Sequence, residues 1–98
     1  MYGTVARLRL KPGMEDKLNE IGQEIKTTPP AGHVTFCIYR MDADPNEYYL
    51  TAVFESKEAY HTNAASPAQD VQYRKLLEIL AADPEWHDGE ITITDAAG

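Results

Sequence analysis

The spacing of the apolar residues changes along the chain, and these changes restrict the fold more than any other feature of the sequence. Apolar and polar residues alternate over residues 2–10, so Ala6, Leu8 and Leu10 share one face of a predicted strand. A Lys-Pro-Gly sequence at 11–13 ends that strand. The next apolar residues have the spacing of one helical stripe: Met14, Leu18, Ile21 and Ile25. The chain is therefore expected to begin with a strand followed by a helix.

The middle of the chain predicts a β-hairpin. Residues 33–41 and 47–55 are rich in β-branched and aromatic side chains, and a turn sequence at 42–46 separates them. The turn begins like a calcium-binding loop, but Glu47 stands where such a loop needs Gly, and Val53 where it needs Glu. We therefore interpret residues 42–46 as an acidic hairpin tip.

The helical region after the hairpin is predicted to be broken in two. Ser56 is expected to cap a short helix that runs to about Asn63. Ser66 is expected to cap a longer helix, with Pro67 at its first position and Gln69 completing a capping box. The apolar stripe of this longer helix is predicted at Tyr73, Leu76, Leu77 and Leu80, and the helix is expected to end at Asp83-Pro84.

A last alternating segment, Glu90 to Thr94, predicts a fourth strand. The resulting order, β-α-β-β-α-β with the second helix split, is that of the ferredoxin-like fold. We expect a single α+β domain over residues 1–98, built on a four-stranded antiparallel sheet.

The predicted sheet has apolar side chains on both faces. In the second strand, Phe36 and Ile38 fall on one face, while Cys37 and Tyr39 fall on the other. The helices can cover only one of these faces, and a second copy of the chain is the simplest cover for the other. We expect a homodimer whose sheets pack face to face; the alternative is a monomer in which tyrosine hydroxyls wet an open face.

Composition excludes several classes of function. Nine basic and sixteen acidic residues give a net charge of −7, and no basic cluster offsets it, so nucleic-acid binding is not expected. No apolar run approaches the roughly 20 residues needed to cross a membrane, and no secretion signal is recognised, which favours the cytoplasm. The three histidines lack the spacing of metal ligands. The single Cys37 cannot form an internal disulfide, and we interpret it as a buried, inert thiol.

The broken helical region carries a family resemblance. A strand that ends in Phe54-Glu55-Ser56, a short helix, and then Ser66-Pro67 opening a long helix resembles the antibiotic biosynthesis monooxygenase family. The early Lys-Pro-Gly followed by an amphipathic helix also fits. The resemblance implies a dimeric α+β barrel of ferredoxin-like fold, with a pocket between the sheet and the helices of each subunit.

The chain departs from that family at several site positions. Many members have Trp where this chain has Phe54. The haem-degrading branch has an Asn in the first strand, that Trp, and a His as iron ligand; here Ala6, Phe54 and Tyr73 stand at the corresponding positions. Because Tyr is a much rarer iron ligand than His, haem degradation is not expected, and we predict no metal or other cofactor.

The cofactor-free, quinone-forming branch offers a closer match. It has a Tyr in the short helix and an Arg in the long helix, where this chain has Tyr60 and Arg74, although Phe54 and Leu50 replace its Trp and Asn. The resemblance implies oxidation of a small aromatic or phenolic, quinol-like metabolite, with Arg74 stabilising a phenolate.

The resulting candidate site has five members. Arg74, Tyr60 and His61 are the candidate catalytic residues, with Tyr60 as a positioning group and His61 as a base; Phe54 and Tyr39 are the candidate substrate-binding residues. Simpler explanations stay open, because Arg74 has the spacing to pair with Asp70 or Glu78 on its own helix, and His61 can be a surface residue. The competing hypothesis for the whole chain is a non-catalytic module that binds or protects a small hydrophobic ligand.

Overall fold

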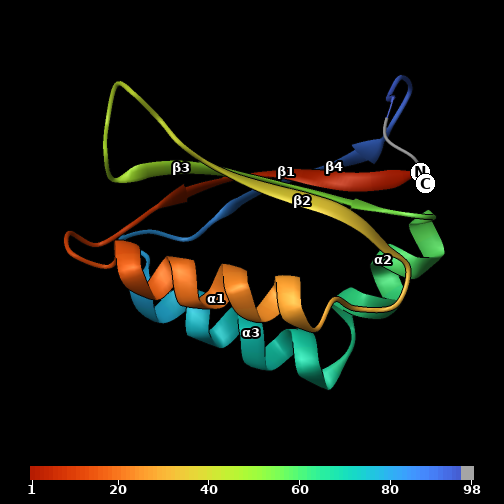
Figure 1. Cartoon of the computed structure of the whole chain (residues 1–98), viewed down its shortest axis with the longest axis horizontal. Coiled ribbons are helices and arrows are strands. Elements are labelled where there is room, and N and C mark those ends of the chain that lie inside the picture. The colour runs from red at the N-terminus through yellow and green to blue at the C-terminus, as the bar shows by residue number, and fades with distance from the viewer. Residues whose placement is uncertain (96–98) are drawn as a thin grey trace.

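The structure, a computed structural model, describes residues 1–95. Its elements follow in the order β1 (Tyr2–Arg9), α1 (Glu15–Thr27), β2 (His33–Arg40), β3 (Glu47–Phe54), α2 (Lys57–Ala64), α3 (Pro67–Ile79) and β4 (Glu85–Glu90). The four strands form one antiparallel sheet in the order β2-β3-β1-β4. Helices α1 and α3 lie side by side under one face of the sheet, and α2 lies at one end of it (Figure 1). The predicted ferredoxin-like α+β fold is confirmed. The prediction of a single domain extends to residues 96–98, which lie outside the described residues.

The core lies between the sheet and the helices α1 and α3. Ala6 and Leu8 of β1 are fully buried, and Leu18 and Ile21 of α1 are buried against them, as the two spacings predict. On α3 the stripe differs from the prediction, because Leu77 is 37% exposed.

The buried residues of α3 and the end of this helix both differ from the prediction. Leu76 and Ile79 are its buried residues, three positions apart. The helix ends at Ile79, four residues before the predicted stop at Asp83, and Leu80 reaches the core from an extended residue bridged to Leu10. Leu80 thus belongs to the core without belonging to the helix.

The fourth strand lies earlier in the chain than predicted. We expected Glu90 to Thr94, whereas β4 runs from Glu85 to Glu90 and pairs with β1. Because β1 begins at Tyr2, it offers no backbone partner beyond a final hydrogen bond from the Ile91 nitrogen to the Met1 oxygen, 3.0 Å long. An edge strand has a pairing partner on one side only, so it ends where that partner ends. The alternation of apolar and polar residues from Ile91 onward therefore did not identify the strand correctly.

The break between α2 and α3 is confirmed. The Ser56 hydroxyl accepts a hydrogen bond from the Ala59 nitrogen, and the Ser66 hydroxyl accepts one from the Gln69 nitrogen, so each serine caps a helix. The predicted capping box is not formed, because the Gln69 side chain instead accepts a 3.4 Å hydrogen bond from Asn63. Asn63 and Gln69 therefore join the two helices across the break.

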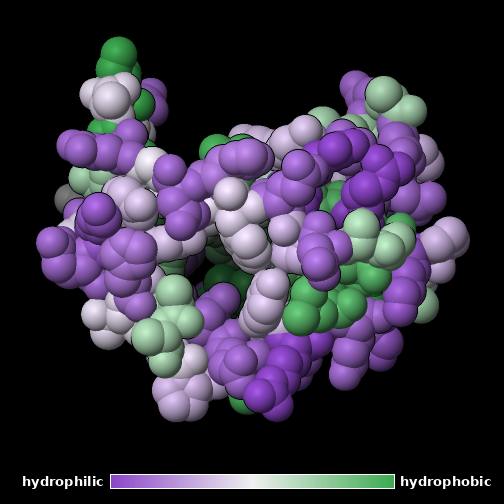
Figure 2. All heavy atoms as spheres, turned by 180° about the vertical axis from the view of Figure 1, so that it is seen from behind, coloured by the Kyte–Doolittle hydropathy of each residue, from purple (hydrophilic) through white to green (hydrophobic). Residues whose placement is uncertain are grey.

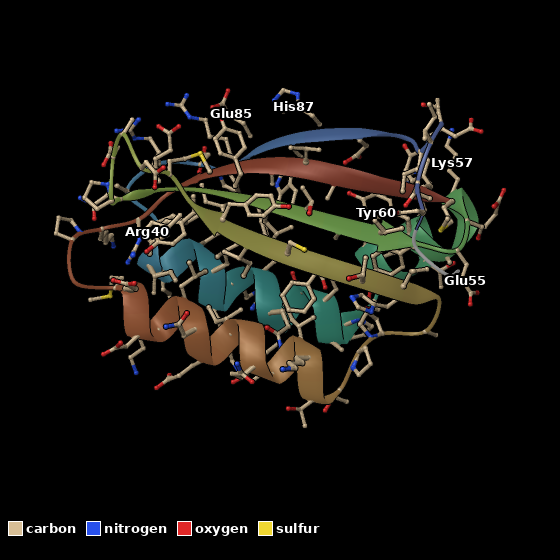
Figure 3. All side chains as sticks on the ribbon, turned by 45° about the horizontal axis from the view of Figure 1, so that its top comes forward. Arg40, Glu55, Lys57, Tyr60, Glu85 and His87 are labelled. Carbon is tan, nitrogen blue, oxygen red and sulfur yellow. The ribbon has the colours of Figure 1, made fainter. Side chains whose placement is uncertain are left out.

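The other face of the sheet carries no helix. Val5 is 46% exposed there, Tyr39 is 52% exposed, and Cys37 is exposed as well, which contradicts the prediction of a buried thiol for the single chain. Figure 3 shows Glu85 and His87 pointing from β4 away from the helices, on this same side. This uncovered face is the surface through which the sequence predicts self-association. Among residues 1–95, no helix combines the length and apolar character needed to span a membrane.

Candidate functional site

A cavity of about 1560 Å³ lies between the sheet and its helical cover. Its walls include apolar side chains from every layer, among them Phe36, Ile38 and Leu50 from the sheet and Leu76 from α3. Figure 2 shows a hollow that opens on the side of the molecule opposite to the view of Figure 1, with hydrophobic atoms at its base. The break between α2 and α3 borders this cavity, because Asn63, Ala64 and Ala68 all line it.

The two long helices are tied together below the cavity. The Glu24 carboxylate of α1 accepts hydrogen bonds from the Gln72 amide at 3.0 Å and from the Lys75 ammonium at 3.1 Å, both on α3. The bond from Lys75 is the main cause that lowers the pKa of Glu24. These exposed contacts link α1 to α3 where Glu24 and Gln72 line the cavity, and surface contacts of this kind each contribute little to stability.

Aromatic rings form the cavity wall nearest to α2. Phe54, only 4% exposed, is the central ring: the His33 ring lies 5.8 Å from it and the Tyr60 ring 5.6 Å from it, both edge-on. Tyr2 continues the cluster, with its ring 5.3 Å from that of Tyr60. Edge-to-face pairs of this kind contribute about 0.5–1.5 kcal/mol each to stability beyond the burial of their area.

Local backbone geometry brings α2 onto the start of β2. The Glu55 nitrogen donates a 2.8 Å hydrogen bond to the Gly32 oxygen, which joins the end of β3 to the start of β2. Gly32 has a φ of +80°, and a Cβ at this position would lie 2.6 Å from the Cβ of Ala59 on α2. Glycine is therefore required for the close approach of α2 to the start of β2.

Tyr60 is held in its protonated form. Its hydroxyl donates a 2.8 Å hydrogen bond to the Asp88 carboxylate of β4. Burial, followed by this bond to Asp88, raises the pKa of Tyr60 to about 12. Figure 3 shows Tyr60 at the α2 end of the sheet. At neutral pH the Tyr60 hydroxyl is thus a neutral group, held between the Asp88 carboxylate and the Thr4 side chain.

The raised pKa of Tyr60 predicts an alkaline loss of stability. Its ordinary value is 10, so the contribution of the neutral phenol is complete below pH 10 and is lost as the pH rises toward 12. Denaturant unfolding of the wild type should show this loss, and Tyr60→Phe should show a smaller one, because it cannot ionise. Tyr39→Phe, on the exposed face, is the control and should behave as the wild type. Parallel alkaline losses in the wild type and Tyr60→Phe would contradict the assignment.

Three of the five predicted site residues meet at the cavity. Phe54, Tyr60 and His61 line it, and His61 lies at its exposed rim, with its ring 5.5 Å from that of Tyr60. The other two, Arg74 and Tyr39, do not line it. The hypothesis that Arg74 stabilises an anion there does not fit its position.

The positions of Arg74 and Tyr39 have simple causes. The Arg74 side chain is 76% exposed and pairs with Asp70 at 3.0 Å, one helical turn earlier, which is the simpler explanation that its spacing allowed. Its neighbour Tyr73 takes the inward direction and lies 6.2 Å from the ring of Trp86, a further cavity residue. Tyr39 lies on the uncovered face because successive residues of a strand alternate between faces.

Sequence reasoning missed His33 as a site residue. It lines the cavity, and its Nε2 atom is buried without a hydrogen-bond partner among residues 1–95. Burial lowers the pKa of His33, so its ring is neutral at physiological pH. A lone histidine at the start of a strand shows no residue spacing that would indicate a functional site. The pairing of His33 with Phe54 across β2 and β3 places it there. No group of three or more potential metal ligands is present within residues 1–95.

Comparisons with known proteins agree with this architecture. The chain superposes on an antibiotic biosynthesis monooxygenase homologue from Chloroflexus aurantiacus J-10-fl with a TM-score of 0.80 at 23% identity, covering 99% of this chain and 98% of the other. It also superposes on a variant of SnoaB, a cofactor-independent oxygenase from Streptomyces nogalater, with a TM-score of 0.81 at 16% identity, covering 96% and 95%. A conserved protein from Methanosarcina mazei Go1 gives a TM-score of 0.78 at 14% identity, covering 90% and 89%. At these identities the likeness establishes the fold.

Sequence comparison establishes the family. No curated protein sequence matches the chain significantly. The family model for antibiotic biosynthesis monooxygenases, however, matches residues 1–71, which hold β1 to β3, α2 and the break before α3. The chain therefore belongs to the antibiotic biosynthesis monooxygenase family.

Proposed function

We propose that the protein is a cofactor-independent monooxygenase that oxidises a small aromatic, phenolic metabolite of the quinol type. The observation that carries this proposal is the large apolar cavity whose aromatic wall holds a neutral phenol, Tyr60, and two imidazoles, His33 and His61. Typical ligand pockets measure roughly 300–1,000 Å³, so the volume of about 1560 Å³ leaves ample room for an aromatic guest. Membership of a monooxygenase family and a fold shared with the cofactor-independent oxygenase SnoaB support the same reaction class.

The proposed chemistry needs little from the protein. Removal of the phenolic proton gives a phenolate, which can pass an electron to dioxygen. In the overall reaction with a quinol, one atom of dioxygen is inserted into a ring C–H bond as a new hydroxyl. The two original hydroxyls lose their hydrogens and become the quinone carbonyls, and the other oxygen atom leaves as water with those two hydrogens. Phe54 forms the apolar wall, Tyr60 positions the substrate hydroxyl, and His61 at the rim is a base in contact with solvent.

A second candidate function, a module that binds or protects a hydrophobic ligand, rests on a specific observation. No Lys or Arg occurs among the described residues that line the cavity, whereas Asp88 and several acidic residues of α1 do. A phenolate would therefore lack the usual cationic partner. A binding module for neutral aromatic ligands needs no such partner.

Oxygen uptake separates the two functions. The purified protein is incubated with a panel of hydroquinones, and dissolved oxygen is recorded against buffer and heat-denatured protein. Uptake above both controls with at least one hydroquinone is the expected result. Uptake at the buffer level with every member, while the same compounds raise the melting temperature, would establish the binding module instead.

Replacement of Arg74 is expected to leave the reaction unchanged. The Arg74 side chain lies outside the cavity and pairs with Asp70 in water, so Arg74→Ala should keep turnover within about twofold and cost less than about 1 kcal/mol of stability. Turnover and denaturant unfolding of the two proteins are compared side by side. A loss of turnover of tenfold or more with intact stability would return Arg74 to the active site.

A further inference from the structure

We propose that His33 is the residue that receives the hydroxyl proton of a phenolic guest, through its Nε2 atom. This inference rests on the proposed function, because it needs an aromatic guest in the cavity. It adds a specific acceptor to that function and replaces His61, the exposed residue at the rim, in this role.

The geometry of His33 is that of an acceptor held ready for a ligand. Its ring is fixed edge-on between Phe54, at 5.8 Å, and Phe36, at 5.9 Å. Its Nε2 atom is buried in the cavity wall, and residues 1–95 supply no hydrogen-bond partner for it. Buried polar atoms are almost always hydrogen-bonded, because a buried donor or acceptor without a hydrogen bond lowers the stability of the fold. A hydroxyl on an aromatic guest meets that need, while Phe36 and Phe54 contact the ring of the guest.

The other candidate acceptors are less suited. The Tyr60 hydroxyl stays protonated and already donates to Asp88 at 2.8 Å, so it cannot take a proton at neutral pH. The Asp88 carboxylate is exposed and occupied by that same bond. His61 is exposed at the rim, where water competes for its ring nitrogens.

Charge also favours His33. The described residues that line the cavity include no Lys or Arg, so a phenolate formed there has no permanent cation beside it. A proton that moves from the hydroxyl oxygen to Nε2 produces an imidazolium next to the phenolate, and the pair as a whole stays neutral. His33 thus supplies both the base and the counter-ion for the first step of the reaction.

Paired ligands test this role by binding alone, without turnover. Hydroquinone and 1,4-dimethoxybenzene share a ring, but only hydroquinone donates a hydrogen bond. Their Kd values are measured by calorimetry under argon for the wild type, His33→Phe and His61→Phe. The ratio of the two Kd values should shift by about 2- to 10-fold against hydroquinone in His33→Phe, which keeps the edge-on aromatic contacts. His87→Phe, measured in the same way, is the control and should keep the wild-type ratio, because His87 lies on the uncovered face of the sheet and does not line the cavity. His61→Phe tests whether the histidine at the rim has this role instead.

A second readout uses the wild type and does not depend on any variant folding. The ¹⁵N chemical shift of His33 Nε2 should move toward the hydrogen-bonded or protonated range when hydroquinone is added under argon, and stay unchanged with 1,4-dimethoxybenzene. A purely structural histidine would respond alike to both ligands.

These experiments separate failure of the His33 assignment from failure of the proposed function. If neither ligand binds the wild type, the proposed function fails. A different outcome is that both ligands bind, while His33→Phe has the same Kd ratio as the wild type and the Nε2 chemical shift does not change with hydroquinone. In that case the cavity is still the binding site, but the assignment of His33 is overturned. A ratio that shifts only in His61→Phe would give the role to His61.

Discussion

Ala52→Trp is expected to abolish both ligand binding and oxygen uptake. Ala52 lies near the middle of the helix-facing side of the sheet, where it pairs with Thr4 of β1 and Phe36 of β2, and it lines the cavity. An indole at this position projects into the space that the guest occupies. Because a guest cannot share that volume, the Kd for hydroquinone should rise at least tenfold and oxygen uptake should fall to the buffer level.

The matched control for this change is Ala82→Trp. Ala82 lies in the exposed segment between α3 and β4 and does not line the cavity, so the same indole there should leave Kd and uptake near their wild-type values. Thermal unfolding of both variants shows that the fold survives. A folded Ala52→Trp protein that keeps wild-type affinity would mean that the guest binds somewhere else.

Val5→Asp is expected to convert a dimer into monomers. We propose that the uncovered face of the sheet is the surface of a homodimer, and Val5 lies within it, between Thr51 of β3 and His87 of β4. Val5 is 46% exposed in the single chain, so the monomer tolerates a carboxylate there. In a dimer each copy would bury an unpaired carboxylate, which costs several kcal/mol and is enough to dissociate most interfaces of standard size.

Val71→Asp is the matched control for Val5→Asp. Val71 is 54% exposed on α3, on the helical side of the molecule, so this variant should keep the assembly of the wild type. Analytical ultracentrifugation at micromolar concentration should give a dimer for the wild type and Val71→Asp, and a monomer for Val5→Asp. A wild type that sediments as a single chain at that concentration would contradict the proposed dimer.

Most of the fold could be predicted from the sequence, because local signals and tertiary packing agree there. The alternation around Leu8, the helical stripe at Leu18 and Ile21, and the caps at Ser56 and Ser66 all took the structure that their spacing indicates. The errors fall where packing alone decides. The face of α3 depends on its contacts with the sheet, and β4 depends on the edge offered by β1.

The candidate site was less predictable for a related reason. Phe54 and Tyr60 came from the family resemblance, and both line the cavity. Neighbouring residues such as Tyr73 and Arg74 point in directions about 100° apart on a helix, so an error of one position moves a side chain out of the site. His33 became visible only through the strand pairing that sets it beside Phe54.

An aromatic guest is expected to lie between the sheet and the helices, and its position can be measured. Intermolecular nuclear Overhauser effects are recorded between hydroquinone, kept under argon, and the methyl groups of the protein. We expect contacts to Ile38, Leu50 and Ala52, which line the cavity. Contacts confined to Val5 on the uncovered face or to Val71 on the outside of α3 would contradict it.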